Sequence, residues 1–232
     1  MSGAEPDRLA AFPRLCSGTG RLIGRCVARI EVEGLEELPA ERSGPLIVAS
    51  NHASNADPLL IASWLTPALG RPVHWLAKEE ALHWPVAGAI MRANGAFGVR
   101  RGAADVEAFR TARRVLDEGR VLALFPEGTR SPDGALRRGK DGATLLAVRT
   151  GAPILPVAIG GSHRFWPKGG FMRPGARLVL RIGPPFSLPE PVRGPDHRAA
   201  LQAATDELMT HIARLLPPSQ RGLYAEAARR PA

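Results

Sequence analysis

The sequence predicts an α/β fold: a mixed, largely parallel central sheet flanked by helices, with a basic amphipathic helix at the N-terminus. Short apolar runs recur along the chain, and helix-like stretches lie between most of them. Such alternation is typical of parallel sheets whose strands are joined by crossover helices. The strand-like runs are Leu46–Ser50, Val73–Ala77, Ala96–Val99, Val121–Phe125, Ile154–Ile159 and Leu178–Ile182.

The helix-like stretches have recognisable ends. Pro58–Leu65 follows Asp57, which we interpret as an N-cap with proline at the first helical position. Ala103–Glu118 ends before Gly119, and Gly142–Thr150 ends before Gly151, where helices commonly stop. A last amphipathic helix ends at Pro217–Pro218 and carries Leu201, Thr205, Leu208, Ile212 and Leu215 on one face.

The N-terminal segment Arg14–Ile30 predicts a helix with an apolar face and an arginine stripe. Such a helix suits an anionic membrane surface, but it also fits a helix packed on the core with a solvated arginine edge. The apolar face carries Leu15, Leu22, Ile23, Cys26, Val27 and Ile30, and the stripe carries Arg14, Arg21, Arg25 and Arg29.

These patterns divide the chain into three parts. Residues 1–33 form the candidate membrane-associating segment, residues 34–216 the main domain and residues 217–232 a flexible tail. The N-terminus has early acidic residues and no apolar core, and no run approaches 18 apolar residues, so we expect neither a signal peptide nor a transmembrane helix.

The net charge of +9 favours an anionic partner such as a nucleic acid, an anionic membrane surface or a phosphate-bearing substrate. Aromatic residues make up only 5% of the chain, whereas proteins that bind single strands interleave aromatic side chains for base stacking. No nucleic-acid-binding motif is visible, so we expect no nucleic acid. The two cysteines are not part of a Cys/His cluster, and we predict no metal site.

The stretch NHASNAD places His52 at the exit of a predicted strand, where α/β proteins position ligands. Histidine is the common general base, and a carboxylate on its other ring nitrogen fixes the productive tautomer. Asp57 could be that carboxylate if the turn folds back. Alternatively, Asp57 is only a helix cap and His52 only a turn residue.

Three further blocks carry polar residues or line an apolar wall. NGAFGVRRG carries two adjacent arginines suited to phosphate or carboxylate, and VLALFPEGTRSPDG delivers Glu127, Gly128 and Arg130 into a loop. Gly128 allows close approach of backbone to a ligand, and Glu127 beside Arg130 suggests a positioning pair. The apolar block TGAPILPVAIGG indicates either a core segment or the wall of an apolar groove. Each block alone also fits an ordinary strand end, surface loop or core segment.

In their order, the four blocks resemble the 1-acylglycerol-3-phosphate acyltransferase (lysophosphatidate acyltransferase) family of glycerolipid acyltransferases. The matching motifs are NHASNAD, GAFGVRR, FPEGTRS and APILPVAI, and the resemblance covers roughly residues 34–186, most of the main domain. The flanks WLAKEEA, RRGKDGA and WPKGG also resemble family segments. Two positions depart from the family pattern: Gly139, where an aromatic residue is usual, and Gly98, where a bulkier residue is common.

The resemblance implies transfer of a fatty acyl group from a thioester to the hydroxyl of a lysophospholipid, with 1-acyl-glycerol-3-phosphate giving phosphatidate. It implies His52 as base, Asp57 as its orienting carboxylate, and a backbone N–H near Gly128 as oxyanion donor. Glu127 would orient the glycerol or Arg130. The expected substrate-binding residues are Arg101, Glu127, Gly128, Thr129, Arg130 and Lys140.

The resemblance implies no cofactor beyond acyl-CoA or acyl carrier protein as the co-substrate that donates the acyl group. We expect peripheral attachment to an anionic membrane surface at its cytoplasmic face. Two alternatives stay open. One is an acyltransferase for another acceptor, such as lyso-ornithine lipid or a lysophosphoglyceride. The other is a catalytically inactive basic module that binds lipid or nucleic acid.

Overall fold

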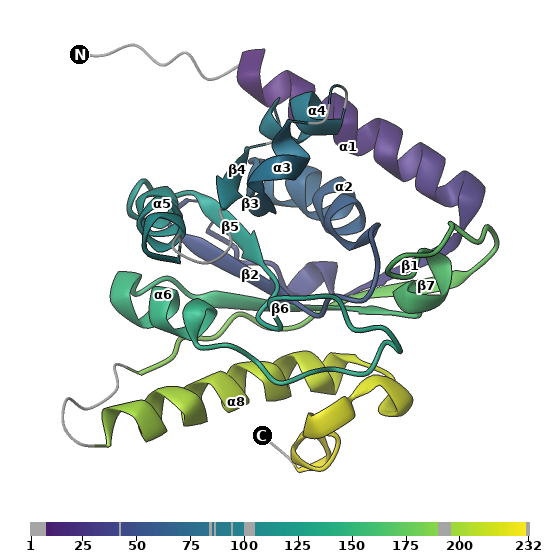
Figure 1. Cartoon of the computed structure of the whole chain (residues 1–232). Helices are drawn as coiled ribbons and strands as arrows, with labels where there is room; N and C mark the ends of the chain where they lie inside the picture. Colours follow the sequence, from purple (N-terminus) through teal and green to yellow (C-terminus); the bar gives the residue numbers. More distant parts are fainter. Residues whose placement is uncertain are drawn as a thin grey trace, which may run out of the picture.

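The structure is a computed structural model that describes residues 8–41, 43–83, 85, 87–93, 95–99, 105–189 and 196–230 (Figure 1). Within these ranges, one seven-stranded sheet has the order β1-β7-β6-β2-β5-β3-β4. Neighbouring strands are parallel except β6 and β7, which are antiparallel, so the predicted mixed sheet is confirmed. The strands are β1 Arg29–Glu33, β2 Leu46–Ser50, β3 Val73–Lys78, β4 Ala96–Val99, β5 Val121–Leu124, β6 Ile154–Gly160 and β7 Arg177–Ile182.

The six predicted strands are present with ends shifted by at most one residue, but β1 is a strand that the sequence analysis missed. Its residues alternate between exposed and half-buried at the sheet edge, so no apolar run marks it. Two exposed ion pairs join it to β7, Arg177 to Glu31 and Arg181 to Glu33. Because β1 pairs with β7, residues 29–33 of the predicted N-terminal segment belong to the same sheet as the main domain.

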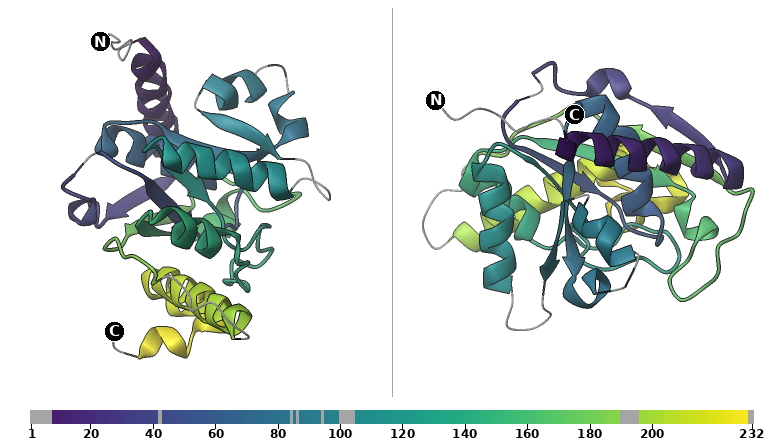
Figure 2. Two further views of the ribbon diagram at one scale, coloured as in Figure 1. Left: turned by 90° about the vertical axis from the view of Figure 1, so that its left-hand side faces the viewer. Right: turned by 90° about the horizontal axis from the view of Figure 1, so that it is seen from above.

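Helices cover both faces of the sheet (Figures 1 and 2). Helices α1 and α2 lie on one face, whereas α5, α6 and α8 lie on the other. The helices are α1 Arg8–Val27, α2 Asp57–Leu69, α3 Glu79–Leu82, α4 Ala87–Ala93, α5 Asp105–Asp117, α6 Gly142–Thr150, α7 Ser162–Phe165 and α8 His197–Leu215, with 3-10 turns η1 Leu35–Glu37, η2 Pro218–Gln220, η3 Gly222–Tyr224 and η4 Ala227–Arg229.

Strand β2 shows how the sheet forms two cores. Leu46 and Val48 pack into the cluster that contains α2, whereas Ile47 and Ala49 pack into the cluster formed with α5, α6 and α8. A strand buried on both faces needs a continuous apolar run instead of an alternating one. This explains why the apolar runs located the central strands correctly.

Helix α1 packs against α2 through small residues. The Ser17 hydroxyl donates to the Ala62 carbonyl at 3.2 Å. A Cβ at Gly20 would lie 2.3 Å from the Ser63 hydroxyl oxygen, so glycine is required for this close approach. Gly20 lowers the helix propensity of α1 but lets the two helices meet.

The predicted apolar face of the N-terminal helix is divided. The helix ends at Val27, and Ile30 lies beyond it in β1. The side chains of both residues pack against the core. Leu15, Leu22 and Ile23 instead face outward with 67%, 66% and 57% exposure. Within the described residues, no helix combines the length and apolar character needed to cross a bilayer.

The expectation of a flexible tail at residues 217–232 is wrong for residues 217–230. Three 3-10 turns fold this segment back along α8, and Gln220 and Tyr224 are both only 6% exposed. This packing was not predicted, because the groups that make it are polar: the Gln220 amide and the Tyr224 hydroxyl. Their partners lie far away in the chain, so local apolar content carries no sign of them.

Candidate active site

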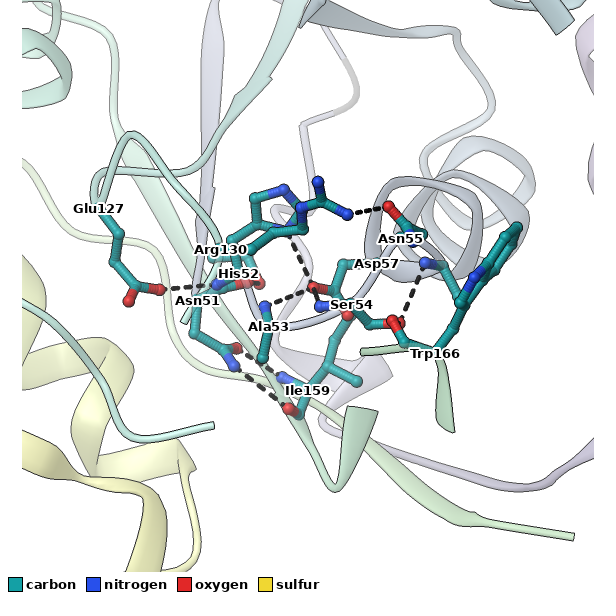
Figure 3. Close-up of polar contacts among 12 residues, drawn as sticks. Asn51, His52, Ala53, Ser54, Asn55, Asp57, Glu127, Arg130, Ile159 and Trp166 are labelled. Atoms are coloured by element: carbon teal, nitrogen blue, oxygen red, sulfur yellow. Dashed lines mark hydrogen bonds and ion pairs between the residues drawn. The ribbon is translucent and has the colours of Figure 1, made fainter. Parts of the chain in front are cut away.

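The candidate site lies where β2 and β5, a parallel pair, end side by side. Residues 51–56, which we call the His52 turn, connect β2 to α2. Residues 125–141, which we call the PEGTR loop, connect β5 to α6. Both connections leave the sheet at the carboxyl edge, where open α/β sheets place their ligands (Figure 3).

His52 and Asp57 meet as predicted, with 2.9 Å between Nδ1 of the ring and Oδ2 of the carboxylate. The same oxygen accepts the backbone N–H groups of Ala53 and Ser54, both at 2.7 Å. Because Oδ2 is therefore an acceptor, Nδ1 carries the proton and Nε2 is left as the basic nitrogen. Asp57 is fully buried, whereas the His52 side chain keeps 18% exposure.

Asp57 is not the N-cap that the sequence suggested. The N-cap is Ala56, and Asp57 is the first residue of α2. Its carboxylate reaches back to the turn that precedes the helix. Its second oxygen, Oδ1, is buried and makes no hydrogen bond within the described residues.

Two flanking residues fix the ends of the His52 turn. The Asn51 side chain exchanges two hydrogen bonds with the backbone of Ile159 in β6, at 2.8 and 3.2 Å. The Ser54 hydroxyl donates to the Trp166 carbonyl at 3.0 Å and accepts the Ala56 N–H at 3.1 Å. Ser54 is buried and engaged on both sides, so it is a turn residue and not an exposed nucleophile.

Phe125 also belongs to the site, although it was not among the residues predicted from the sequence. Its ring stacks on the His52 imidazole, with 3.9 Å between ring centroids and 10° between the planes. The buried Trp75 backs it with a centroid separation of 5.6 Å. Its place at the end of β5, next to the PEGTR residues, was the available signal. The stack fixes the plane of the imidazole and covers one of its faces.

Glu127 was expected to pair with Arg130, but its carboxylate instead binds backbone N–H groups. Its carboxylate accepts the His52 N–H at 2.7 Å and the Arg137 N–H at 3.0 Å. The side chain is only 3% exposed, and burial raises the pKa of Glu127 to about 7, with the Asp57 charge acting in the same direction. The two N–H groups oppose this shift. Glu127 thus joins the His52 turn to the PEGTR loop.

Gly128 has a φ of +67°, and its N–H donates to the Phe125 carbonyl at 3.0 Å. That N–H is therefore occupied, so Gly128 itself does not supply the oxyanion donor we expected near it. A Cβ at Gly128 would lie 3.0 Å from the Lys140 ammonium nitrogen, so the Lys140 side chain lies directly over this glycine. The half-buried Thr129 follows.

Arg130 comes from the PEGTR loop and donates a hydrogen bond to the Asn55 side-chain oxygen in the His52 turn (Figure 3). With Lys140, it places two cationic side chains on the loop that borders the His52 ring. Arg101 of the second block lies outside the described residues. Among the described side chains, no group of three metal-ligating residues is found.

Comparison with known proteins shows which family shares the sequence and the fold around this site. The family model described as Acyltransferase matches residues 29–160, which covers β1 through β6 and therefore both the turn and the loop. The crystal structure of the 1-acyl-sn-glycerophosphate (LPA) acyltransferase PlsC from Thermotoga maritima superposes with a TM-score of 0.69 at 28% identity. The match covers 87% of this chain and 81% of that one.

Curated sequences agree. The 1-acyl-sn-glycerol-3-phosphate acyltransferase of Limnanthes alba is 32% identical over 75% of this chain and 62% of its own length. The protein of the same name from Pseudomonas aeruginosa is 27% identical over 85% of this chain and 74% of its own. The chloroplastic LPAT1 of Arabidopsis thaliana is 32% identical, and the match spans only 38% of that protein.

Proposed function

This chain belongs to the acyltransferase family, and from that premise we propose that it moves a fatty acyl group from an acyl thioester to the free hydroxyl of a lysophospholipid. We take the acceptor to be 1-acyl-glycerol-3-phosphate, which would give phosphatidate. The observation that carries the proposal is the His52–Asp57 pair, whose basic nitrogen has no partner among the described residues, next to the loop that carries Arg130 and Lys140.

In this reaction, Nε2 of His52 takes the proton of the acceptor hydroxyl as its oxygen attacks the thioester carbonyl. The carbonyl electrons move onto the oxygen and return as the carbon–sulfur bond breaks. The imidazolium then returns its proton to the leaving thiolate, so the products are an ester and a free thiol. Asp57 keeps Nδ1 protonated throughout and stabilises the imidazolium, and Phe125 holds the ring plane.

The acceptor phosphate fits the cationic side of the site. Arg130 offers a planar fork to two phosphate oxygens, and Lys140 offers a compact charge above Gly128. We assign Arg101 and the Thr129 hydroxyl to the same headgroup. Backbone N–H groups of Thr129 and Arg130 are the remaining oxyanion candidates in the PEGTR loop, because Gly128 is engaged.

The activity test measures thiol release and lipid product with the purified chain and acyl-CoA. Lysophosphatidate, lyso-ornithine lipid and a lysophosphoglyceride are compared at matched concentration, with a reaction lacking acceptor as the hydrolysis control. We expect phosphatidate by mass spectrometry, and transfer by His52→Ala about 10²–10⁴-fold slower than by the wild-type chain. Preference for an acceptor without a phosphate monoester would favour the sibling acyltransferase, whereas salt-dependent nucleic-acid or lipid binding without transfer would favour an inactive module.

We also propose that the protein attaches peripherally to an anionic membrane surface, at the cytoplasmic face where acyl-CoA or acyl carrier protein is available. The exposed Leu15, Leu22 and Ile23 form one contact. A second is the tip of the α7–β7 loop, where Phe171 and Met172 are 92% and 45% exposed. No acidic residue occurs between Asp141 and Glu190, so this tip is flanked only by cations: Arg164, Lys168 and Arg173.

Vesicle flotation tests the attachment. Leu22→Ser with Ile23→Ser, and separately Phe171→Ser, should each lower binding to anionic phospholipid vesicles several-fold. Leu223→Ser is the matched control, because Leu223 is 73% exposed but lies in the C-terminal turns. Equal binding by all variants would remove these contacts from the proposal, and equal binding to neutral vesicles would remove the electrostatic part.

A further inference from the structure

The PEGTR loop is a long connection without helix or strand, although it carries Glu127, Arg130 and Lys140. Backbone groups in such a loop need hydrogen-bond partners from elsewhere in the fold. At one end, the loop is tied to the site itself, through the Glu127 carboxylate and the Ser131 N–H, which donates to the His52 carbonyl at 2.7 Å. Its second half, residues 134–139, is held by a different part of the molecule.

That part is the C-terminal segment 217–230, which we call the strap (Figures 1 and 2). The Leu136 N–H donates to the Gln220 carbonyl at 2.8 Å, and the Leu136 carbonyl accepts from Leu223 at 3.4 Å. The Gln220 side-chain amide donates to the Gly134 carbonyl at 3.2 Å. The Tyr224 hydroxyl accepts the Gly139 N–H at 3.2 Å.

The strap is itself fixed on its other side. The Gln220 amide oxygen accepts the Gly161 N–H at 2.9 Å, where β6 meets α7. The Tyr224 hydroxyl donates to the Asp206 carboxylate on α8 at 3.1 Å. Gln220 therefore binds the loop through its amide nitrogen and the core through its amide oxygen, whereas Tyr224 makes both contacts through its one hydroxyl group. The position of the loop is therefore fixed relative to α8 and to the end of β6.

Two close approaches leave little slack in this arrangement. Gly222 has a φ of +52°, and a Cβ there would lie 2.0 Å from the Leu136 carbonyl oxygen. On the opposite side of the loop, a Cβ at Gly139 would lie 2.6 Å from Met209 of α8. The second half of the loop is thus clamped between the strap and α8 without room for side chains at these positions.

The clamped residues are connected to His52 through Glu127. Leu136 and Gly139 stand on either side of Arg137, whose N–H binds one oxygen of Glu127. The other oxygen of Glu127 binds the backbone N–H of His52. Lys140 follows Gly139, and its backbone N–H donates to the Pro126 carbonyl at 2.8 Å. A shift of the loop at residues 136–139 would therefore move both the Glu127 bridge and the ammonium above Gly128.

We propose that the strap positions the PEGTR loop for acyl transfer, with Gln220 and Tyr224 as positioning residues that act through Glu127 and Lys140. This inference rests on the proposed function for its kinetic consequence, while its structural consequence is independent of that function. Neither residue touches substrate. Their effect is to hold the cationic loop at a fixed distance from the base.

The test uses three full-length variants. Tyr224→Phe keeps the ring and removes the hydroxyl, and Gln220→Met keeps the volume and removes both amide groups. Leu223→Ala is the control, because its side chain is exposed and only its backbone contacts the loop. Amide hydrogen exchange is followed in residues 134–140 and in the His52 turn, below the unfolding midpoint of every variant, together with kcat and the KM of each substrate.

We expect Tyr224→Phe and Gln220→Met to accelerate exchange in residues 134–140 and in the His52 turn at least tenfold. They should lower kcat about tenfold and raise the acceptor KM more than the donor KM, with Leu223→Ala unchanged. Unchanged exchange in residues 134–140, or faster exchange with wild-type kcat, would overturn the inference. If the wild-type chain transfers no acyl group to any acceptor, the proposed function fails, and joint acceleration of the loop and the turn alone decides for or against the strap.

Discussion

The two strand-to-helix connections of the site are held together in different ways. In the His52 turn, the ring is oriented from within one short stretch of chain, because Asp57 accepts hydrogen bonds from residues three to five positions earlier. The backbone and the ends of this turn are fixed by β6, by Trp166 and by Glu127. The PEGTR loop depends on partners from the turn and from the strap at the far end of the chain. The short connection carries the proposed base, and the long one carries the proposed cationic pocket. Local sequence thus encodes the chemistry, whereas tertiary packing positions the binding groups.

The largest expected effect lies in the turn. His52→Ala should lower kcat by about 10²–10⁴, the usual contribution of a general base, without unfolding the protein. Asp57→Asn should cost a similar factor, because an amide in place of the carboxylate no longer fixes the tautomer. Steady-state acyl transfer under saturating substrates measures both.

Groups that act as one unit give non-additive losses, so the double variant should be little slower than His52→Ala. Circular dichroism and thermal unfolding are the controls for folding. Near-wild-type turnover by His52→Ala would remove the turn's chemical role and with it the contrast between the two connections.

The next effect tests the bridge between turn and loop. Because the pKa of Glu127 is raised from 4.5 to about 7, the folded protein holds a proton that the unfolded chain has lost between these pH values. Stability from this group is fully present below pH 4.5 and is lost as the pH rises through about 7. The change amounts to about 3 kcal/mol at most.

Urea unfolding of wild type and Glu127→Gln at several pH values isolates this contribution. The stability of wild type relative to the variant should be greatest near pH 4.5 and should fall towards pH 7.5. A difference that does not vary with pH would mean that burial of this carboxylate leaves its protonation unchanged on folding.

The loop's cation gives a smaller effect on a different parameter. Arg130→Ala should raise the acceptor KM about ten- to a hundredfold and leave the donor KM within about twofold, as for loss of one charge-assisted phosphate contact. Arg101→Ala should behave alike. Arg149→Ala on the exposed surface of α6 serves as the charge control. Equal rises in both KM values would argue against phosphate binding by the loop.

The smallest effect concerns the ring stack between Phe125 of the PEGTR loop and His52 of the turn. Phe125→Leu removes the aromatic partner of the His52 ring, a contact worth about 0.5–1.5 kcal/mol beyond area burial. The expected loss in kcat is therefore about two- to tenfold. Phe125→Tyr, which keeps a ring in the stack, should restore most of it. Equal kcat for Leu and Tyr variants would show that the stack does not orient the imidazole.

Much of the fold was predictable because its strands are buried on both faces and appear as apolar runs. The turn was predictable because His52 and Asp57 act over a short stretch of chain. Strand β1 was not, since an edge strand with exposed Glu31 and Glu33 has no apolar pattern.

The site residues that sequence reasoning misplaced depend on contacts between distant segments. Glu127 was assigned to Arg130 three residues away, but it binds backbone groups of His52 and Arg137. Neither partner has a side-chain type that a motif could reveal, because the donors are main-chain N–H groups. Tyr224 and Gln220 were assigned to a free tail for the same reason.

The small-residue seam between α1 and α2 has a mechanical consequence. Asp57 is the first residue of α2, and Gly20 brings α1 into direct contact with that helix at Ser63. A movement of α1 would therefore also move α2, and with it the Asp57 carboxylate that orients the His52 ring. A displacement of α1 against the sheet would therefore reach the base through α2, without requiring any contact between α1 and His52 itself.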